Sequence, residues 1–377
     1  MKRNIPITKP YFTKDEEREV IAALRSGWVV QGPRVESFEN EIAKYVGAKY
    51  AVATSSCTTA LHLALFLLGV GPGDEVIVPS FTFIATANSV LYTGATPVFA
   101  DVAKDTYNLD PKDVKRKITK RTRVIMPVHQ AGLAAPMPEI MEIAKKYNLR
   151  IVEDAACALG ARINGKHAGT FGEIGCFSFH PRKSITTAEG GMLVTNNEEF
   201  EKSARVLRAH GMSVSDRERH ESKSFVNETY DVLGYNYRMS DIHAAIGLAQ
   251  FRKLNFILEK RTALATRYTQ YLSDVTYVIP PAFPEGYTHT FQSYVIRLSE
   301  DCPFSREEIM TKLFEKGISA RIGIKACHLE PLYRNQKAHL PNTELLAKNI
   351  ITLPLYTSMT QNEQDFIINS IHENITE

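Results

Sequence analysis

Short apolar runs alternate with helical patterns through the first two-thirds of the chain, and this alternation constrains the fold more than any other feature. Runs such as VIVPS, RVIMPV and RIVED are apolar enough to be covered on both faces, as parallel strands are. The predicted strands are Tyr50–Ser55, Glu75–Pro79, Thr96–Asp101, Arg123–Val128, Arg150–Asp154, Gly175–Phe179 and Gly191–Thr195, and the helices between them include Thr58–Leu68, Ile84–Tyr92 and Pro136–Tyr147. The sequence therefore predicts an α/β sheet that binds ligands beyond the carboxyl ends of its strands.

A second region follows this sheet. The pattern is helical from about Asp241 to Leu272, and a further strand (FQSYVIRL) and helix (SREEIMTKLFEKG) come after it. A chain of 377 residues has room for two domains. We expect residues 1–250 to form a large domain and residues 251–377 a smaller α/β domain. The polar stretch 211–230 has no periodicity and predicts a solvated loop, or alternatively a loop that borders the active site.

Charge and composition exclude several classes of protein. A formal net charge of +3 without a dense Lys/Arg run argues against a nucleic-acid-binding surface. The start of the chain lacks a secretory signal pattern, and the longest apolar stretch, near 60–70, is too short to cross a bilayer. Five scattered cysteines without CxxC spacing indicate reduced thiols. The histidines show no metal-ligand spacing. We expect a cytoplasmic protein with no metal and no membrane partner.

Two segments follow predicted strands and carry groups suited to an anionic or aromatic ligand. In ATSSCTTALHLAL a strand ends, small hydroxyl residues follow and a helix begins, so the amides of Cys57 and Thr58 can bind a phosphate. An ordinary helix cap explains the same residues. Asp154 ends the strand RIVED, where an ionised carboxylate can hold a pyridine nitrogen protonated. A helix cap or surface acid remains the alternative for Asp154.

The segment GCFSFHPRKSITTAEGGM carries a lysine in unusual surroundings. Ser178 lies at the end of a strand, a His-Pro pair breaks that strand, and Lys183 follows in a loop of small and apolar residues. One hydroxyl there can bind a phosphate while the amine reaches an aldehyde. Burial of the amine would lower its proton affinity and favour Schiff-base chemistry. Most lysines are solvated surface charges, but Lys183 has few charged neighbours to keep it at the surface.

These segments in this order resemble the DegT/DnrJ/StrS family of nucleotide-sugar aminotransferases. The resemblance runs over nearly the whole chain, through SGWVVQGPRVESFE, PSFTFIATAN, ADVAKDTYNLDP, PVHQAG, VEDAACALGA, CFSFHPRKSITTAEGGM, GYNYRMSDIHAAIGLAQ and ITLPLYTSMT. It implies an aspartate aminotransferase-like fold of type I, with a mostly parallel seven-stranded sheet, and pyridoxal 5'-phosphate as cofactor, with pyridoxamine 5'-phosphate as its second form. It also implies an amino acid donor, glutamate, and a nucleotide-linked keto sugar as acceptor.

The resemblance assigns roles to individual residues. Lys183 would carry the cofactor and move the proton, and Asp154 would pair with the pyridine nitrogen. Phe83 would stack on the ring, while Ser178 and the amides of Cys57 and Thr58 would hold the phosphate. The family forms dimers with shared active sites, so Asn236 and Arg238 would reach the partner's site. His328 matches a substrate-side histidine of members that aminate the sugar C4, with Lys325 beside it. That match favours a 4-keto-6-deoxy sugar.

The chain departs from the family at Cys157, where Gln or His is frequent close to the cofactor. Because a thiol is a weak hydrogen-bonding group, that contact is expected to be lost or moved. His129 and His180 are better explained by packing than by catalysis.

Related dehydratases carry His where this chain has Lys183, which disfavours dehydration. A nicotinamide dehydrogenase is disfavoured because no GxGxxG follows the first strand. A regulatory, non-enzymatic role would predict a degraded site, whereas Lys183, Asp154 and Ser178 are all present.

Overall fold

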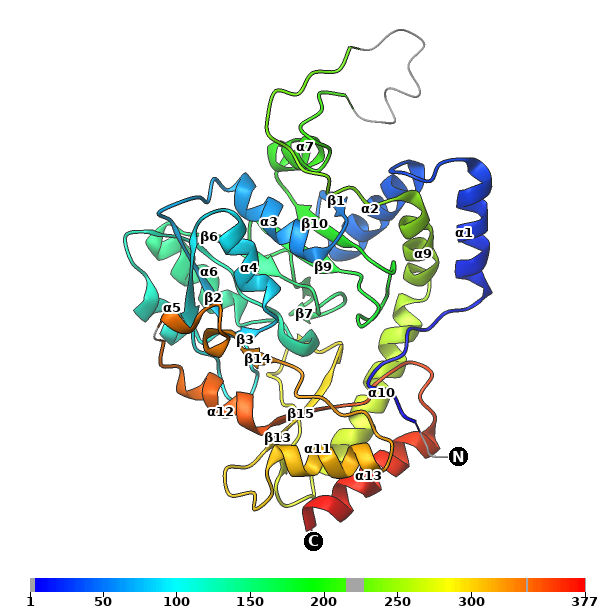
Figure 1. Ribbon diagram of the computed structural model, residues 1–377, viewed down its shortest axis with the longest axis vertical. Helices are drawn as coiled ribbons and strands as arrows, with labels where there is room; N and C mark the ends of the chain where they lie inside the picture. Colours follow the sequence, from blue (N-terminus) through cyan, green and yellow to red (C-terminus); the bar gives the residue numbers. More distant parts are fainter. Residues whose placement is uncertain (1–3, 215–226, 337, 377) are drawn as a thin grey trace.

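The computed structural model describes residues 4–214, 227–336 and 338–376, and its largest element is a seven-stranded sheet (Figure 1). In spatial order the strands are β1 (Tyr50–Thr54), β10 (Gly191–Thr195), β9 (Ile174–Ser178), β6 (Arg150–Asp154), β5 (Thr122–Ile125), β2 (Glu75–Pro79) and β4 (Thr96–Ala100). Strand β10 is antiparallel to both neighbours, and the other adjacent pairs are parallel. The predicted mostly parallel seven-stranded sheet is confirmed. Strands β1, β2, β6 and β9 end at the same edge.

Both faces of this sheet are covered, because its central strands place apolar side chains on each of them. Along β2, Val76 and Val78 pack into one hydrophobic cluster and Ile77 packs into another. The first cluster is completed by α3 (Cys57–Leu67), α4 (Ala85–Tyr92) and α7 (Glu198–Leu207), and the second by α2 (Pro33–Val46), α5 (Pro111–Lys117) and α6 (Met137–Tyr147). This is the arrangement expected when alternate side chains point to opposite faces.

A smaller antiparallel sheet forms a separate hydrophobic core. Its strands are β11 (Val278–Ile279), β13 (Tyr294–Leu298) and β15 (Ile350–Leu353), and it packs with α11 (Arg306–Glu315) and α13 (Gln361–Thr376). Helix α10 (Leu254–Leu272) runs between the two cores, with Ile257 in the larger and Ala265 in the smaller. Ile5 also packs in the smaller core. The division of the chain near residue 250 stays a prediction.

Several short elements complete the described chain. These are β3 (Phe81–Thr82), β7 (Arg162–Ile163), β8 (Lys166–His167), β12 (Tyr287–Thr288), β14 (Lys325–Ala326), α12 (Pro341–Asn349), and the 3-10 turns η1 (Gln130–Gly132), η2 (Cys327–Leu329) and η3 (Arg334–Gln336). Strand β14 pairs with β3 in an antiparallel bridge. The C-terminal third of the chain is therefore joined to the loop that follows β2. Within the described ranges, none of the helices combines the length and apolar character needed to cross a lipid bilayer.

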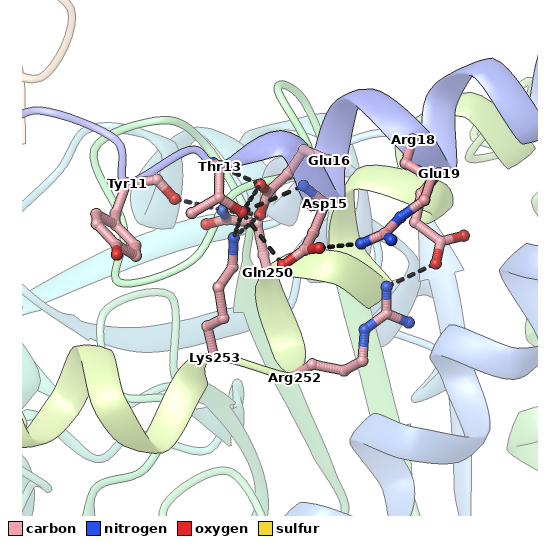
Figure 2. Close-up of polar contacts among 9 residues, drawn as sticks. All are labelled: Tyr11, Thr13, Asp15, Glu16, Arg18, Glu19, Gln250, Arg252 and Lys253. Carbon is pink, nitrogen blue, oxygen red and sulfur yellow. Dashed lines mark hydrogen bonds and ion pairs between the residues drawn. The ribbon is translucent and has the colours of Figure 1, made fainter.

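A polar network ties α1 (Lys14–Ser26) to the junction between α9 (Asp241–Phe251) and α10 (Figure 2). Buried Glu16 accepts hydrogen bonds from the Thr13 amide at 2.8 Å and from Gln250 at 2.6 Å, and it forms an ion pair with Lys253. Burial by itself would raise the pKa of Glu16, but the Lys253 charge and the other donors lower it below its usual value. The network fixes the N-terminal segment, and residues Ile7 and Thr8 of this segment line a cavity at the large sheet, which is described below.

The predicted elements match the structure except at a few ends. Strands β2, β6 and β10 have the predicted bounds. The helical run expected from Asp241 to Leu272 is split at Arg252–Lys253, where Lys253 leaves helical geometry and binds Glu16. Of the expected loop at 211–230, residues 215–226 lie outside the described residues. On its described flanks, Met212 and Tyr230 form an antiparallel bridge.

Candidate active site

A cavity of about 840 Å³ opens at the carboxyl edge of the large sheet. One wall comes from the ends of strands and the loops after them, and it includes Ser56, Asp154 and Lys183. The opposite wall comes from the C-terminal region, through Ala320–Ile324 and the end of β15. The predicted site residues Cys57, Thr58, Phe83 and Ser178 also line this cavity. Ligand binding at this edge is the general behaviour of open α/β sheets.

Lys183 lies in a loop between β9 and β10 that backbone hydrogen bonds hold in place. The Phe179 amide donates to Gly190 O at 2.9 Å, and the Thr187 amide donates to Phe179 O at 2.9 Å. The Lys183 ammonium donates a hydrogen bond to Cys157 Sγ at 3.1 Å. Burial alone would lower the pKa of Lys183, but the neighbouring Cys157, Cys57 and Asp154 raise it above its usual value. Burial therefore acts in the expected direction on this amine, but its neighbours outweigh it and the net shift of the Lys183 pKa is upward.

Asp154 is the last residue of β6, and its carboxylate is buried at the base of the cavity. Thr86 donates to Asp154 Oδ2 at 2.8 Å, and the Ala156 amide donates to Oδ1 at 3.2 Å. Since the Thr86 proton points to Asp154, the contact of 2.9 Å between the hydroxyls of Thr82 and Thr86 has Thr82 as donor. Burial raises the pKa of Asp154, and these hydrogen bonds and the Lys183 charge offset only part of that rise. A cationic group beside Asp154 would restore its ionisation.

Glu153, which precedes Asp154, forms its hydrogen bonds inside the protein and not at the cavity. Its carboxylate is fully buried on the other face of β6 and accepts hydrogen bonds from the amides of Gly169, Phe171 and Gly172 at 2.6–2.7 Å. His129 Nε2 contacts the same carboxylate at 2.9 Å, and His129 Nδ1 accepts from the Ala135 amide. His129 therefore carries its proton on Nε2 and is uncharged. Neither Glu153 nor His129 is among the described residues that line the cavity.

The N-terminus of α3 presents free amides to the cavity. Ser56 caps the helix by accepting a hydrogen bond from the Thr59 amide at 3.2 Å, and the Thr59 hydroxyl accepts one from the Ser56 amide. The first-turn amides of Cys57 and Thr58 have no acceptor within the helix. A Cβ atom at Gly191 would lie 2.5 Å from the Cys57 nitrogen, so only glycine allows β10 to pass this close. Burial raises the pKa of the Cys57 thiol well above its usual value, so Cys57 offers the site its amide and not a thiolate.

The remaining residues of the large-sheet wall differ in exposure. Ser178 ends β9, and its hydroxyl accepts a hydrogen bond from the His180 amide at 3.4 Å. His180 Nδ1 accepts from the Arg182 amide at 3.2 Å, and burial lowers the pKa of His180. Phe83 follows β3 and is 76% exposed, so one ring face is free to contact a ligand or a second subunit. Ser178 and Phe83 both line the cavity, and their contacts with a phosphate and a ring stay predictions.

Four predicted residues lie outside the lining of this cavity. Asn236 and Arg238 belong to the segment before α9, and their contact with a neighbouring subunit stays a prediction. His328 is buried: its amide donates to Ser80 Oγ at 3.1 Å, and its Nδ1 contacts the same oxygen at 2.6 Å. Lys325 is exposed and pairs with Glu330 at 3.1 Å. The positions of His328 and Lys325 in one subunit therefore do not support direct contact with substrate.

Three further cavity residues escaped the sequence analysis. Thr86 is 68 positions from the aspartate to which it donates, so only the fold brings the two together. Arg182 precedes Lys183, and Arg321 lies on the opposite wall, where two backbone hydrogen bonds to Thr352, at 2.7 and 3.1 Å, fix it. Neither guanidinium has a hydrogen bond or ion pair with another residue in the described part of the chain. Of these three residues, Arg182 could have been found from the sequence, because it directly precedes Lys183.

The cavity thus holds a lysine amine, a buried carboxylate, helix amides that attract anions and two arginines whose guanidiniums have no partner among the described residues. A lysine amine can form a Schiff base with a carbonyl compound. A carboxylate can neutralise a protonated ring nitrogen, and helix amides can bind a phosphate. Among the described residues, no group of three or more His, Cys, Asp or Glu side chains could hold a metal ion.

Comparison with known proteins identifies the family. Residues 10–372 match the model of the DegT/DnrJ/EryC1/StrS aminotransferase family. The spore coat polysaccharide biosynthesis protein SpsC of Bacillus subtilis is 37% identical, with 99% of this chain and 98% of SpsC covered. A putative sugar aminotransferase of Streptococcus pneumoniae, Spr1654, solved in forms with pyridoxamine phosphate (PMP) and pyridoxal phosphate (PLP), is 31% identical, with TM-scores of 0.92 and 0.91 over 99% of both chains.

The aminotransferase PseC of Helicobacter pylori, which takes part in pseudoaminic acid biosynthesis, is 29% identical and has a TM-score of 0.92 over 99% of this chain and 100% of its own. The residues of the cavity fit pyridoxal phosphate, since an amine, a carboxylate and anion-attracting amides line it. The chain therefore belongs to the DegT/DnrJ/EryC1/StrS aminotransferase family and is a pyridoxal-phosphate-dependent sugar aminotransferase with the type I fold.

Proposed function

We propose that the enzyme transfers an amino group from glutamate to a nucleotide-linked 4-keto-6-deoxy hexose. The observation that carries the proposal is the convergence of Lys183, Asp154 and the N-terminus of α3 on one cavity. The cavity also contains two arginines whose guanidiniums have no partner in the described part of the chain. The similarity to SpsC and PseC supports a role in amino-sugar and surface polysaccharide synthesis. Lys183 in the place of the dehydratases' histidine argues against dehydration.

The chain's own groups divide the work at this site. When bound, pyridoxal phosphate supplies an aldehyde for the amino group and a ring that accepts the electron pair of the broken bond. Asp154 would hold the ring nitrogen protonated, and the amides of Cys57 and Thr58 with Ser178 would hold the phosphate. Lys183 would hold the cofactor between turnovers and, once released, move the proton between carbon atoms as general acid and base.

The cationic side of the cavity suits both substrates. An amino acid donor carries carboxylates, and a nucleotide sugar carries a diphosphate, so both are anions when they enter. Arg182 and Arg321 line the cavity from separate walls, and their guanidiniums are not neutralised by any described carboxylate. Arginine forms bidentate hydrogen bonds with carboxylate and phosphate alike. One cavity can therefore accept the two substrates in turn, as a ping-pong transamination requires.

We also propose that the enzyme is a cytoplasmic homodimer. Several large apolar side chains are solvent-exposed in the single chain, including Phe83 (76%), which lines the cavity, and also Tyr92 (58%) and Leu233 (79%). Exposed apolar surface of this kind is typical of an interface. Asn236 and Arg238 would then reach the phosphate of the partner's cofactor. The five cysteines are free thiols, which supports a reducing compartment.

A half-reaction assay tests the proposal. The enzyme is converted to its pyridoxamine phosphate form, nucleotide-linked 4-keto and 3-keto sugars are added one at a time, and the cofactor absorbance and product mass are followed. We expect one 4-keto-6-deoxy sugar to yield an amino sugar and to restore the lysine-bound cofactor. If only 3-keto sugars react, the position of amination in the proposal is wrong. If glutamate cannot generate the pyridoxamine form, the donor is wrong. A Lys183→Arg variant is the control for non-enzymatic exchange.

A further inference from the structure

We propose that Gln292 is a positioning residue for the reaction, because it reaches across the cavity and holds the backbone carbonyl directly before Lys183. The proposal rests on the role proposed above for Lys183 and names a residue that keeps this lysine in place. The contact involves a peptide carbonyl and not the lysine amine. It can therefore form whether or not that amine is bonded to the cofactor.

The contact joins the two walls of the cavity. Gln292 Nε2 donates a hydrogen bond to Arg182 O at 2.8 Å, across 110 positions of the sequence, and both residues line the cavity. The Ser293 hydroxyl donates to Gln292 Oε1 at 3.2 Å, which leaves the amide nitrogen to face the carbonyl. The Lys183 amide, in the same peptide unit as that carbonyl, donates to His180 O at 2.8 Å. The peptide unit before the lysine is therefore held by its oxygen from one wall and by its nitrogen from the other.

The segment that carries Gln292 has a strained backbone. Phe291, the residue before it, has a φ of 47°, and Ala131, in the facing turn η1, has a φ of 53°. Residues with a side chain rarely adopt this left-handed conformation, and they keep it only where the surrounding structure enforces it. Here the Ser293 amide donates to Ala131 O at 3.3 Å, so the two strained turns bind each other where the cavity walls meet.

A buried arginine holds the same segment from α10. Arg261 donates from Nε to Phe291 O at 3.0 Å and from Nη2 to Gln292 O at 2.5 Å. It is 3% exposed, no carboxylate pairs with it in the described part of the chain, and burial lowers the pKa of Arg261 to about 10. Burying a cation without a counter-ion costs stability. The position of these two consecutive carbonyls is therefore maintained at a cost, as is typical of functional segments.

The arrangement has a consequence for the lysine. A lysine amine sits on a flexible four-carbon chain, so its reach depends on where the backbone is held. During proton transfer the amine has to stay within hydrogen-bonding reach of the reacting atoms, and small misplacements cost much of the rate. Gln292 lies two residues before β13, which pairs with β15, and Thr352 of β15 binds the backbone of Arg321. Lys183 and an anion bound at Arg321 are thus positioned by one hydrogen-bonded frame.

Hydrogen–deuterium exchange in the enzyme with bound pyridoxal phosphate tests the contact independently of activity. Gln292→Met removes the donor and keeps the length of the side chain, and it should fold because this residue is partly exposed. We expect the peptide that spans 180–186 to exchange about two- to tenfold faster, as for one lost hydrogen bond. Ser293→Ala, which frees the amide to turn, should give a smaller increase. Gln270→Met, at an exposed position of α10, is the matched control and should equal the wild type.

Kinetics separate positioning from direct contact with substrate. In Gln292→Met the saturating rate of the half-reaction with glutamate should fall about two- to tenfold, while the KM for glutamate stays at the wild-type value. The circular dichroism of the cofactor's absorption band should also change, because a displaced lysine turns the cofactor that it holds. A KM that rises at an unchanged saturating rate would mean that Gln292 binds substrate, and it overturns the proposal. Exchange of 180–186 at the wild-type rate in Gln292→Met overturns it as well.

Fixation of the cofactor distinguishes failure of this proposal from failure of the proposed function. Borohydride should fix pyridoxal phosphate to Lys183 in the wild type and in Gln292→Met alike. If it does so, and the exchange and the saturating rate of the variant equal those of the wild type, only the role of Gln292 is overturned. If borohydride does not fix the cofactor to Lys183 in the wild type, the role of that lysine is overturned, and the present proposal falls with it.

Discussion

Among the described residues, Thr86 is the only side-chain donor to Asp154, and replacing it by Val removes that donor while keeping the volume of the residue. The hydrogen bond from Thr86 to Asp154 Oδ2 is 2.8 Å long, and both groups are buried. A hydrogen bond to a charged group contributes about 1.5–3 kcal/mol, so loss of this one should weaken binding of the cofactor or slow the half-reaction by about 10- to 100-fold.

The sign of the pH effect follows from the same contact. Burial already raises the pKa of Asp154, and the Thr86 hydrogen bond lowers it. Without Thr86 the pKa rises further, so the carboxylate becomes protonated at higher pH, and the acid limb of the rate profile should move to higher pH. The assay is the pH profile of the half-reaction, with cofactor affinity measured by absorbance titration.

A Thr93→Val variant is the matched control, because Thr93 follows the same helix, α4, and its hydroxyl donates only to Val90 O at 2.8 Å. It should leave the affinity and the pH profile unchanged. The reasoning is refuted if Thr86→Val and Thr93→Val behave alike, since Asp154 would then not depend on its hydroxyl donor.

Three further predictions concern charge. Asp154→Asn should stabilise the protein without cofactor near neutral pH, because ionisation of a carboxyl with a raised pKa opposes folding. The gain in stability should vanish below the usual pKa of aspartate, and thermal unfolding measured across a range of pH tests this. Glu39→Gln should lower the free energy of unfolding in urea by about 3–5 kcal/mol, since buried Arg208 loses its partner, and an unchanged value would contradict this. Arg321→Gln should raise the KM for the nucleotide sugar about tenfold, whereas Lys325→Gln on the same segment should not.

The large sheet was predictable from the sequence because its strands are short apolar runs bounded by turn residues. The bounds of β2, β6 and β10 follow directly from VIVP, RIVED and GMLVT. The ends of α9 and α10 did not follow, because the break at Lys253 depends on Glu16, which is 237 positions away. Local sequence patterns specify that a helix forms, but a contact between residues far apart in the sequence decides where that helix ends.

The candidate site was predictable on one wall only. Lys183, Asp154 and the start of α3 follow strands, so the topology brings them to one edge. The opposite wall, with Arg321, comes from a region whose position relative to the sheet no local pattern specifies. His328 shows the reverse case, since a motif marked it for the site but the structure buries it against Ser80. Cys157 was recognised as a departure, and only the structure brings it to Lys183.

The most direct test of the account is to find the lysine that binds the cofactor. The protein is incubated with pyridoxal phosphate, reduced with borohydride, digested and mapped by mass spectrometry, with Lys183→Arg as the control. The account predicts a single modified peptide that carries the cofactor on Lys183, and no stoichiometric modification in the variant. Stoichiometric modification of a different lysine, or a Lys183→Arg variant that retains wild-type turnover, would contradict it.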